Sequence, residues 1–244
     1  MEENRPLVVV DNDYKYGVEH GYFPKSNLEG MFELMTIEEA REKGRFKSLP
    51  TEDDADYTGY YVYNPYADSY SLLTDPNVDN DFIITESVAY KEALIRLGAK
   101  EIEIEKFVGD TVFSKKKVNL EGSYGPVEGG MEVNSSKTIK DELTSKLTFS
   151  DPDNYASYAE AEKYIENHGL ALDSNLTSWL MRLKERGELK GKETLSITYL
   201  KEINDVWNIV AKLDLKTFSM KFGIESEVAA SRKYEVTVKV DFGL

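Results

Sequence analysis

Four oxygen-bearing side chains in the first half of the chain have the spacing of a calcium site. Counted from Asp75, the segment DPNVDNDFIITE places oxygen donors at positions one, three, five and twelve, namely Asp75, Asn77, Asp79 and Glu86. Calcium takes its ligands from carboxylate, amide and carbonyl oxygens, and short acidic loops supply them at such intervals. Calcium is therefore the one cofactor that the sequence suggests.

Over these twelve residues the segment resembles the loop of EF-hand proteins, with hydrophobic Phe82 at position eight and a helix expected directly afterwards. The resemblance implies calcium binding. The segment departs from the family at position six, where Asn80 replaces the glycine of the sharp turn, and Ile83 offers no ligand at position nine. The alternative is an Asp/Asn turn followed by a short strand and a capped helix.

A second candidate for chemistry is the pair Asp11 and Asp13, which ends the apolar run in LVVVDND. This pattern resembles the first motif of haloacid-dehalogenase-type phosphatases. The resemblance implies that Asp11 is the nucleophile and Asp13 the general acid or base, with magnesium neutralising charge. Lys15 stands where that motif has threonine or valine, and the chain lacks the alternating strand–helix pattern of a parallel sheet. The alternative is a strand that ends in an Asx turn.

The composition narrows the remaining classes of chemistry. The chain has no cysteine and only two histidines, His20 and His168, which leaves little material for thiolate sites, zinc sites or a Ser-His-Asp triad. His168 is expected at the end of a helix, where a modest structural role is the simpler interpretation. The sequence therefore favours a protein that is not an enzyme.

Charge and the lack of targeting signals restrict partners and location. The 30 basic and 45 acidic residues give a formal net charge of −15, which disfavours binding to nucleic acid and to anionic lipid. We recognise neither a signal peptide nor an apolar stretch of about 20 residues, the length that spans a bilayer. A cysteine-free chain also fits the reducing cytoplasm, where we expect the protein to act.

Tyrosines cluster in the segment DYTGYYVYNPYADSY. They are Tyr57, Tyr60, Tyr61, Tyr63, Tyr66 and Tyr70. Tyrosine supplies a large contact area at low entropic cost, so these side chains could form a binding surface for a protein partner or for a second copy of the chain. Alternatively, Tyr61 and Tyr63 share one face of an edge strand and simply cover the sheet.

Local signals predict four helices and an antiparallel sheet. Helices are expected at 36–44, 85–98, 155–169 and 174–187, the first with a capping box of Thr36 and Glu39. Apolar and polar residues alternate in five segments, as in strands with one buried face, at 99–108, 117–122, 193–200, 207–215 and 233–242. We expect one domain over 1–244, with an irregular, tyrosine-rich part at 1–80 and a core at 85–244.

A comparison of the sequence with itself places the predicted strands in two related groups. Ile102–Ile104 matches Ile197–Tyr199, and Lys117 matches Lys212, at the same offset of 95 positions. We therefore predict an α+β fold whose twisted antiparallel sheet consists of two β-meanders, at about 97–139 and 192–242, with about four helices packed on it. An internal duplication and two unrelated meanders both explain the match.

The glycine-rich segment KVNLEGSYGPVEGGMEVNSSK belongs to the first of these meanders. It lacks the Gly-Lys-Ser/Thr sequence of a phosphate-binding loop. We interpret its glycines as a hairpin turn near Gly125, or as bulges, with strand alternation resuming at Met131 and Val133.

Three functions remain. The first is a non-enzymatic interaction or self-assembling protein that uses a β-sheet and tyrosine-rich surface. The second is a membrane-active effector: residues 112–139 and 206–242 are two long alternating segments separated by two helices. This arrangement resembles the architecture of pore-forming proteins such as gasdermins and perforins, which implies membrane contact only after refolding. The third is the phosphatase-like hydrolase with Asp11 and Asp13.

Overall fold

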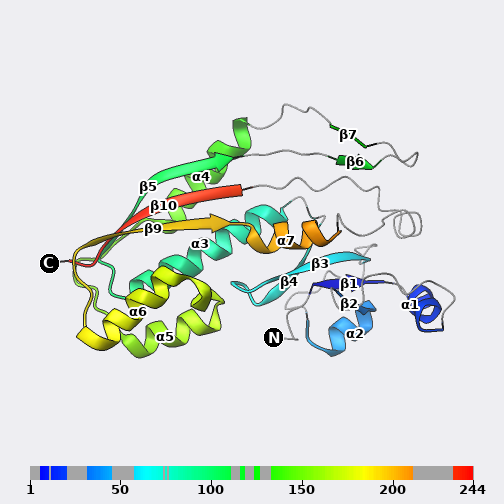
Figure 1. The fold of residues 1–244 in the computed structure, drawn as a ribbon, viewed down its shortest axis with the longest axis horizontal. Coiled ribbons are helices and arrows are strands. Elements are labelled where there is room, and N and C mark those ends of the chain that lie inside the picture. The colour runs from blue at the N-terminus through cyan, green and yellow to red at the C-terminus, as the bar shows by residue number, and fades with distance from the viewer. Residues whose placement is uncertain are drawn as a thin grey trace.

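The protein has an α+β fold, and its described residues form two four-stranded sheets and a separate two-stranded sheet (Figure 1). It is described by a computed structural model. The residues that this structure describes are 6–10, 12–20, 32–45, 58–73, 75, 77–110, 116–118, 124–126, 133–210 and 233–243.

The N-terminal part contains a mixed sheet of four strands in the order β2-β1-β3-β4. β1 runs parallel to β2 and antiparallel to β3, and two helices, α1 and α2, accompany the strands. The bounds are β1 Leu7–Val9, α1 Asn12–Glu19, β2 Glu33–Met35, α2 Ile37–Glu42, β3 Gly59–Asn64 and β4 Ser69–Leu72. The expectation of an irregular N-terminal part was wrong in this respect, because short strands without alternation hid the sheet.

The two central strands of this sheet, β1 and β3, are buried on both faces, which explains their lack of alternation. One face of the sheet contributes to the main core, which also holds the apolar sides of the later helices and strands. From the sheet and the residues next to it, this core includes Val8, Val10, Phe32, Tyr60 and Val62. The opposite face forms a second core under α2, made of Leu7, Val9, Met35, Ala40, Tyr61 and Tyr70. An apolar run such as LVVV therefore fills two cores at once.

The second sheet is antiparallel throughout, as the sequence predicted, in the order β8-β5-β10-β9. Leu195, Ile197 and Tyr199 are buried on one face of β9, while Ser196 and Thr198 between them are exposed. The register of β10 against β5 shifts between Thr237 and Val238, as at a β-bulge. The bounds are β5 Glu101–Asp110, β8 Phe149–Ser150, β9 Lys192–Tyr199 and β10 Lys233–Asp241.

Among the described residues, the strands of this sheet do not form simple meanders. A helix, α4, lies between β5 and β8 in the chain, and another, α7, lies between β9 and β10. The predicted strand at 207–215 was wrong for residues 207–210, which belong to α7, and strand alternation does not resume at Val133, where α4 begins. The rest of the 207–215 segment and Met131 lie outside the described residues.

The four predicted helices are all present, with one displaced start. α2 has the expected capping box of Thr36 and Glu39, and α6 ends at Gly187 with a φ of 78°. α3 begins at Val78, earlier than the expected 85. The helices after the first sheet are α3 Val78–Arg96, α4 Val133–Leu147, α5 Tyr158–Asn167, α6 Ser174–Arg186 and α7 Lys201–Val210, with a short 3-10 helix at Leu170–Leu172.

The glycine-rich segment does contain paired strands. β6, Lys116–Val118, pairs antiparallel with β7, Tyr124–Pro126. Gly125, expected at the turn, instead lies within β7 opposite Lys117.

The helices α3, α5 and α6 lie together below the strands β5, β10 and β9 in the view of Figure 1, whereas α7 extends from the end of β9 towards β3. α7 therefore links the two four-stranded sheets. Leu200, between β9 and α7, is fully buried and has a φ of 65°, a left-handed conformation that side-chain-bearing residues rarely adopt. Within the described residues, no helix is both long enough and apolar enough to cross a membrane.

Candidate functional site

The aspartate pair of the phosphatase-like motif is only partly described. Asp11 lies outside the described residues. Asp13 lies exposed in the first turn of α1, where a carboxylate interacts favourably with the helix dipole. The strand before it belongs to a mixed sheet, whereas the phosphatase resemblance implies a parallel one. The described residues thus add no support to a phosphatase.

The predicted calcium loop is largely helical. Asp79 and Glu86 both lie within α3, about 10 Å apart along its axis at 1.5 Å per residue, while Asp75 and Asn77 precede the helix. Asp75 accepts a hydrogen bond from the backbone N–H of Asn77 at 2.8 Å, which is the Asx turn of the alternative interpretation. The loop conformation expected from the EF-hand resemblance was therefore wrong. In the described ranges, no group of three or more His, Asp or Glu side chains is arranged to hold a metal ion.

The tyrosine cluster does not form one exposed surface. Tyr60 and Tyr61 are each 5% exposed, and they point into the main core and the second core respectively. Tyr70 is also buried in the second core, and Tyr63 is half-buried with its hydroxyl donating to Asp68 at 2.7 Å. Tyr57 lies outside the described residues. The prediction of a tyrosine-rich binding surface is wrong for Tyr60, Tyr61 and Tyr70, because the sheet is covered on both faces.

Both histidines occupy the same local arrangement at a helix end. Nδ1 of His20 lies 2.9 Å from the Tyr16 carbonyl, and Nδ1 of His168 lies 2.9 Å from the Tyr164 carbonyl. Each imidazole also stacks on the tyrosine four residues earlier, with 3.9 Å between ring centroids. Both rings thus bond a carbonyl near the end of a helix, which agrees with the structural role expected for His168.

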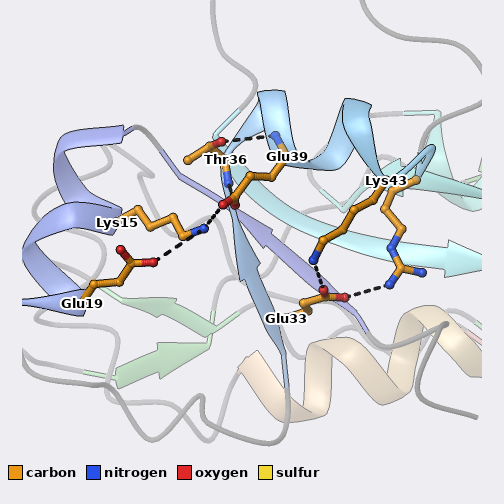
Figure 2. Close-up of polar contacts among 7 residues, drawn as sticks. Lys15, Glu19, Glu33, Thr36, Glu39 and Lys43 are labelled. Atoms are coloured by element: carbon orange, nitrogen blue, oxygen red, sulfur yellow. Dashed lines mark hydrogen bonds and ion pairs between the residues drawn. The ribbon is translucent and has the colours of Figure 1, made fainter.

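Ion pairs tie α1 and β2 to α2 in the N-terminal part (Figure 2). The Lys15 ammonium donates to Glu39, which also closes the capping box with Thr36. Glu33 on β2 accepts from Lys43 at 2.8 Å and from Arg45 at 3.1 Å. The Lys15 ammonium is the main cause of the lowered pKa of Glu39. These exposed and half-buried pairs hold helices in place rather than forming a reactive centre.

A cluster of polar side chains with buried, incompletely hydrogen-bonded carboxylates lies where α3, α7 and the β3–β4 turn meet. The Tyr66 hydroxyl, in that turn, donates to Oε1 of Glu86 at 3.0 Å and lies 3.5 Å from Oε1 of Glu202. Glu86 is only 3% exposed. The second carboxylate oxygen, Oε2, of each glutamate is buried without a hydrogen-bond partner among the described residues. We call Tyr66, Glu86 and Glu202 the junction cluster.

Burial governs the protonation of this cluster. It raises the pKa of Glu86 well above its usual value, and the nearby carboxylate of Glu202 raises it further, while bonds from Tyr66 and the Leu200 backbone lower it less. Burial also raises the pKa of Glu202. A single tyrosine proton cannot satisfy two carboxylates, so the pair retains a proton at pH values where an exposed glutamate would be ionised.

Sequence reasoning placed Glu86 in a calcium loop and did not single out Glu202. A helical signal was present nonetheless, because Glu86 falls three and four residues from Ile83, Phe82, Ala89 and Tyr90, which all face the core. A glutamate at such a position must be paired or neutral. That signal could have marked Glu86, whereas the approach of Glu202 depends on α7, which the sequence did not predict and whose last residues, 207–210, were predicted as a strand.

Comparison with known proteins adds no relative: no protein-family model, no curated protein and no solved structure matches this chain.

Proposed function

We propose that the protein is a non-enzymatic interaction protein that self-assembles through the free edge of its antiparallel sheet. The observation that carries this proposal is the position of β9. This strand of eight residues, Lys192–Tyr199, ends the sheet and has β10 as its only strand partner among the described residues. A long edge strand offers unpaired backbone groups to another strand.

The hydrogen-bond pattern identifies the groups that face outward. The Phe242 N–H donates to the Gly191 carbonyl at 3.0 Å, just before the first residue of β9. Because hydrogen-bonded and non-hydrogen-bonded pairs alternate in an antiparallel ladder, Glu193, Leu195 and later odd-numbered residues direct their N–H groups at β10. The backbone groups directed away from β10 then belong to Thr194, Ser196 and Thr198.

The side chains at this edge suit strand addition. Thr194, Ser196 and Thr198 are exposed and uncharged, and β9 contains no proline and no bulge against β10. Charged residues and proline are the usual protection of edge strands, and here charge is limited to Lys192 and Glu193 at the start of the strand. The occupant we propose is a strand of a second copy, and the cytoplasm is the proposed place of action.

Proline at an outward-facing position tests this role. Thr194→Pro removes an N–H that faces away from β10, so the intramolecular ladder remains while strand addition is blocked. Thr194→Val, which keeps the N–H, is the matched control. We expect light scattering after size exclusion to give molar masses of two or more times 27.8 kDa for the wild type and for Thr194→Val. Thr194→Pro should have the monomer mass of 27.8 kDa.

Two results would contradict the proposal. The first is a wild-type chain that stays monomeric at every concentration tested. The second is a Thr194→Pro variant with native circular dichroism and the same mass as the wild type.

A second candidate function is membrane action through residues 112–139 and 206–242. The observation that favours it is the pairing of Asp110, the last residue of β5, with Lys233, the first residue of β10. The first segment therefore follows β5, and the part of the second segment that precedes β10 enters that strand, at the same end of two neighbouring strands, as paired hairpins that refold together would require. Dye release from vesicles of neutral or anionic lipid tests this function, and vesicles that stay sealed at neutral and acidic pH would remove it.

A further inference from the structure

The junction cluster joins three elements that are distant in the chain. Glu86 comes from α3, Glu202 from the first turn of α7, and Tyr66 from the turn between β3 and β4. The Tyr66 hydroxyl is the atom that the two carboxylates share. α7 also packs against β3, so this cluster lies where the two four-stranded sheets are connected.

The cluster has fewer hydrogen bonds than its charges would require. If both glutamates were ionised, two negative charges would share one side-chain donor, with only backbone N–H groups to assist it, and the buried Oε2 atoms would have no hydrogen-bond partner among the described residues. An unpaired charge in such a place is strongly unfavourable, because it loses its hydration without gaining a partner. With a proton on one carboxyl, an uninterrupted chain of carboxyl, phenol and carboxylate becomes possible, and the repulsion disappears.

Few other charges can compensate for this repulsion. Of the described residues, Lys201 is the one cation that acts on the pair, and its side chain is exposed. The remaining groups that face the cluster are acids or phenols, which favour the protonated pair. They are Tyr90 of α3, Tyr199 of β9 and Asp205 of α7, with Asp173 acting on Tyr90 from the start of α6.

The connection beside the cluster is strained. Leu200 joins β9 to α7 with a φ of 65°, and it is a buried residue with a branched side chain. A left-handed conformation is unfavourable for such a residue because its Cβ comes too close to the following carbonyl oxygen. Release of α7 from the junction would let Leu200 leave this conformation, so the strain favours opening once the cluster no longer holds the helix.

We propose that Tyr66, Glu86 and Glu202 form a proton-controlled latch, which holds α7 at the junction while the two carboxyls share a proton and releases it when that proton is lost. The latch closes at lower pH and opens at higher pH. The sign follows from the burial of the pair: the closed state binds a proton more tightly than the open state does, so protons favour closure. The latch is independent of the role proposed for β9.

Hydrogen exchange measured along the chain tests the latch. After correction for the intrinsic exchange rate, we expect protection of residues 201–210 to fall as the pH rises from about 5 to about 8, by up to tenfold per pH unit where one proton is linked to opening. Protection of α6 serves as the internal reference, because its residues do not belong to the cluster.

Glutamine substitutions keep the shape of the side chains and remove the titration. Glu86→Gln and Glu202→Gln should each make protection of residues 201–210 nearly independent of pH, and Glu166→Gln, at an exposed position on α5, should leave the wild-type profile unchanged. Glu202 is half-buried, so Glu202→Gln keeps the test available if the more buried Glu86→Gln does not fold.

The expected and contrary outcomes are distinct. Tyr66→Phe, which removes the shared hydroxyl, should lower protection of residues 201–210 at every pH, and Tyr63→Phe is its matched control on the same hairpin. The latch would be wrong if residues 201–210 showed the same pH profile as α6. It would also be wrong if both glutamine variants kept the wild-type profile.

Discussion

Ser87 of α3 and Tyr199 of β9 are hydrogen-bonded inside the main core, with 3.0 Å between their hydroxyl oxygens and both side chains 0% exposed. Ser87 Oγ also bonds the Ile83 carbonyl at 2.6 Å. This contact is the polar link between the longest helix and the edge strand of the antiparallel sheet. Ser87 keeps the Ile83 carbonyl as a second partner, so removing the Ser87 hydroxyl, but not the Tyr199 hydroxyl, leaves a buried hydroxyl with the cost of an unmet hydrogen bond.

The first prediction compares the two ends of this bond. Tyr199→Phe keeps the ring in place and leaves Ser87 bonded to Ile83, so the free energy of unfolding should fall by about 0.5–1.5 kcal/mol. Ser87→Ala leaves the Tyr199 hydroxyl buried without this partner and should cost more, about 1–3 kcal/mol. Urea unfolding followed by circular dichroism measures both. The double variant should lose less than the sum of the two losses, and strict additivity would show that the hydroxyls do not interact.

The second prediction concerns two glycines with left-handed backbones. Gly187, after α6, has a φ of 78° and open space around the position of a Cβ, so Gly187→Ala should cost only the conformational penalty of about 1–2 kcal/mol. At Gly98, with a φ of 92°, a Cβ would lie 2.9 Å from the Ala156 Cβ and 3.0 Å from its backbone nitrogen. Gly98→Ala should therefore lose about 1–3 kcal/mol more in the same unfolding experiment. Equal losses would contradict this assignment of the close contact.

The third prediction is a dependence on acid in the N-terminal part. The Lys15 ammonium lowers the folded-state pKa of Glu39 below its ordinary 4.5. A lowered folded pKa contributes stability that is present above the unfolded pKa and is lost as the pH falls through the folded pKa. The wild type should therefore be more stable than Lys15→Met at neutral pH, with the difference vanishing in acid.

The size of that difference should be modest, because 38% of the Glu39 side chain is exposed and solvent screens the pair. We expect less than about 1 kcal/mol. Unfolding free energies of both proteins at a series of pH values below neutrality measure it. A difference that stayed constant on acidification would mean that the packing of Lys15, rather than its charge, stabilises α2.

The sequence predicted well those elements whose signals are local. β9 and β10 show strict alternation because one face of their sheet is buried, and α2 and α6 have caps that can be recognised within a few residues. These features do not depend on which distant segment comes to lie beside them, so the antiparallel sheet and four helices could be predicted without knowledge of the fold.

The failures have physical causes that can be named. β1 and β2 are each three residues long, and they pair in parallel although they are far apart in the chain. Neither alternation nor a tight turn therefore marks them in the sequence. The first residues of α3, including Asp79, suit a turn as well as they suit the start of a helix, where acids are favourable. The junction cluster depends on three distant segments, and only the buried position of Glu86 could be anticipated.

The fourth prediction uses Asn154, which closes the end of α3. Its Nδ2 donates to the carbonyls of Ile95, in the last turn of α3, and of Ala99, just beyond the helix, each at 2.8 Å, and so ties the helix end to the chain that follows it. Asn154→Ala removes both bonds and should lower the free energy of unfolding by about 1–3 kcal/mol.

Asn154→Asp is nearly the same size but turns two donors into a charged acceptor that faces two carbonyls, so at neutral pH it should be the more harmful change. Acidification should narrow the gap between the two variants, because a protonated aspartate can donate one of the lost bonds. Urea unfolding at neutral and acidic pH measures that gap, and an aspartate variant as stable as the wild type would show that Asn154 does not hold the helix end through its amide.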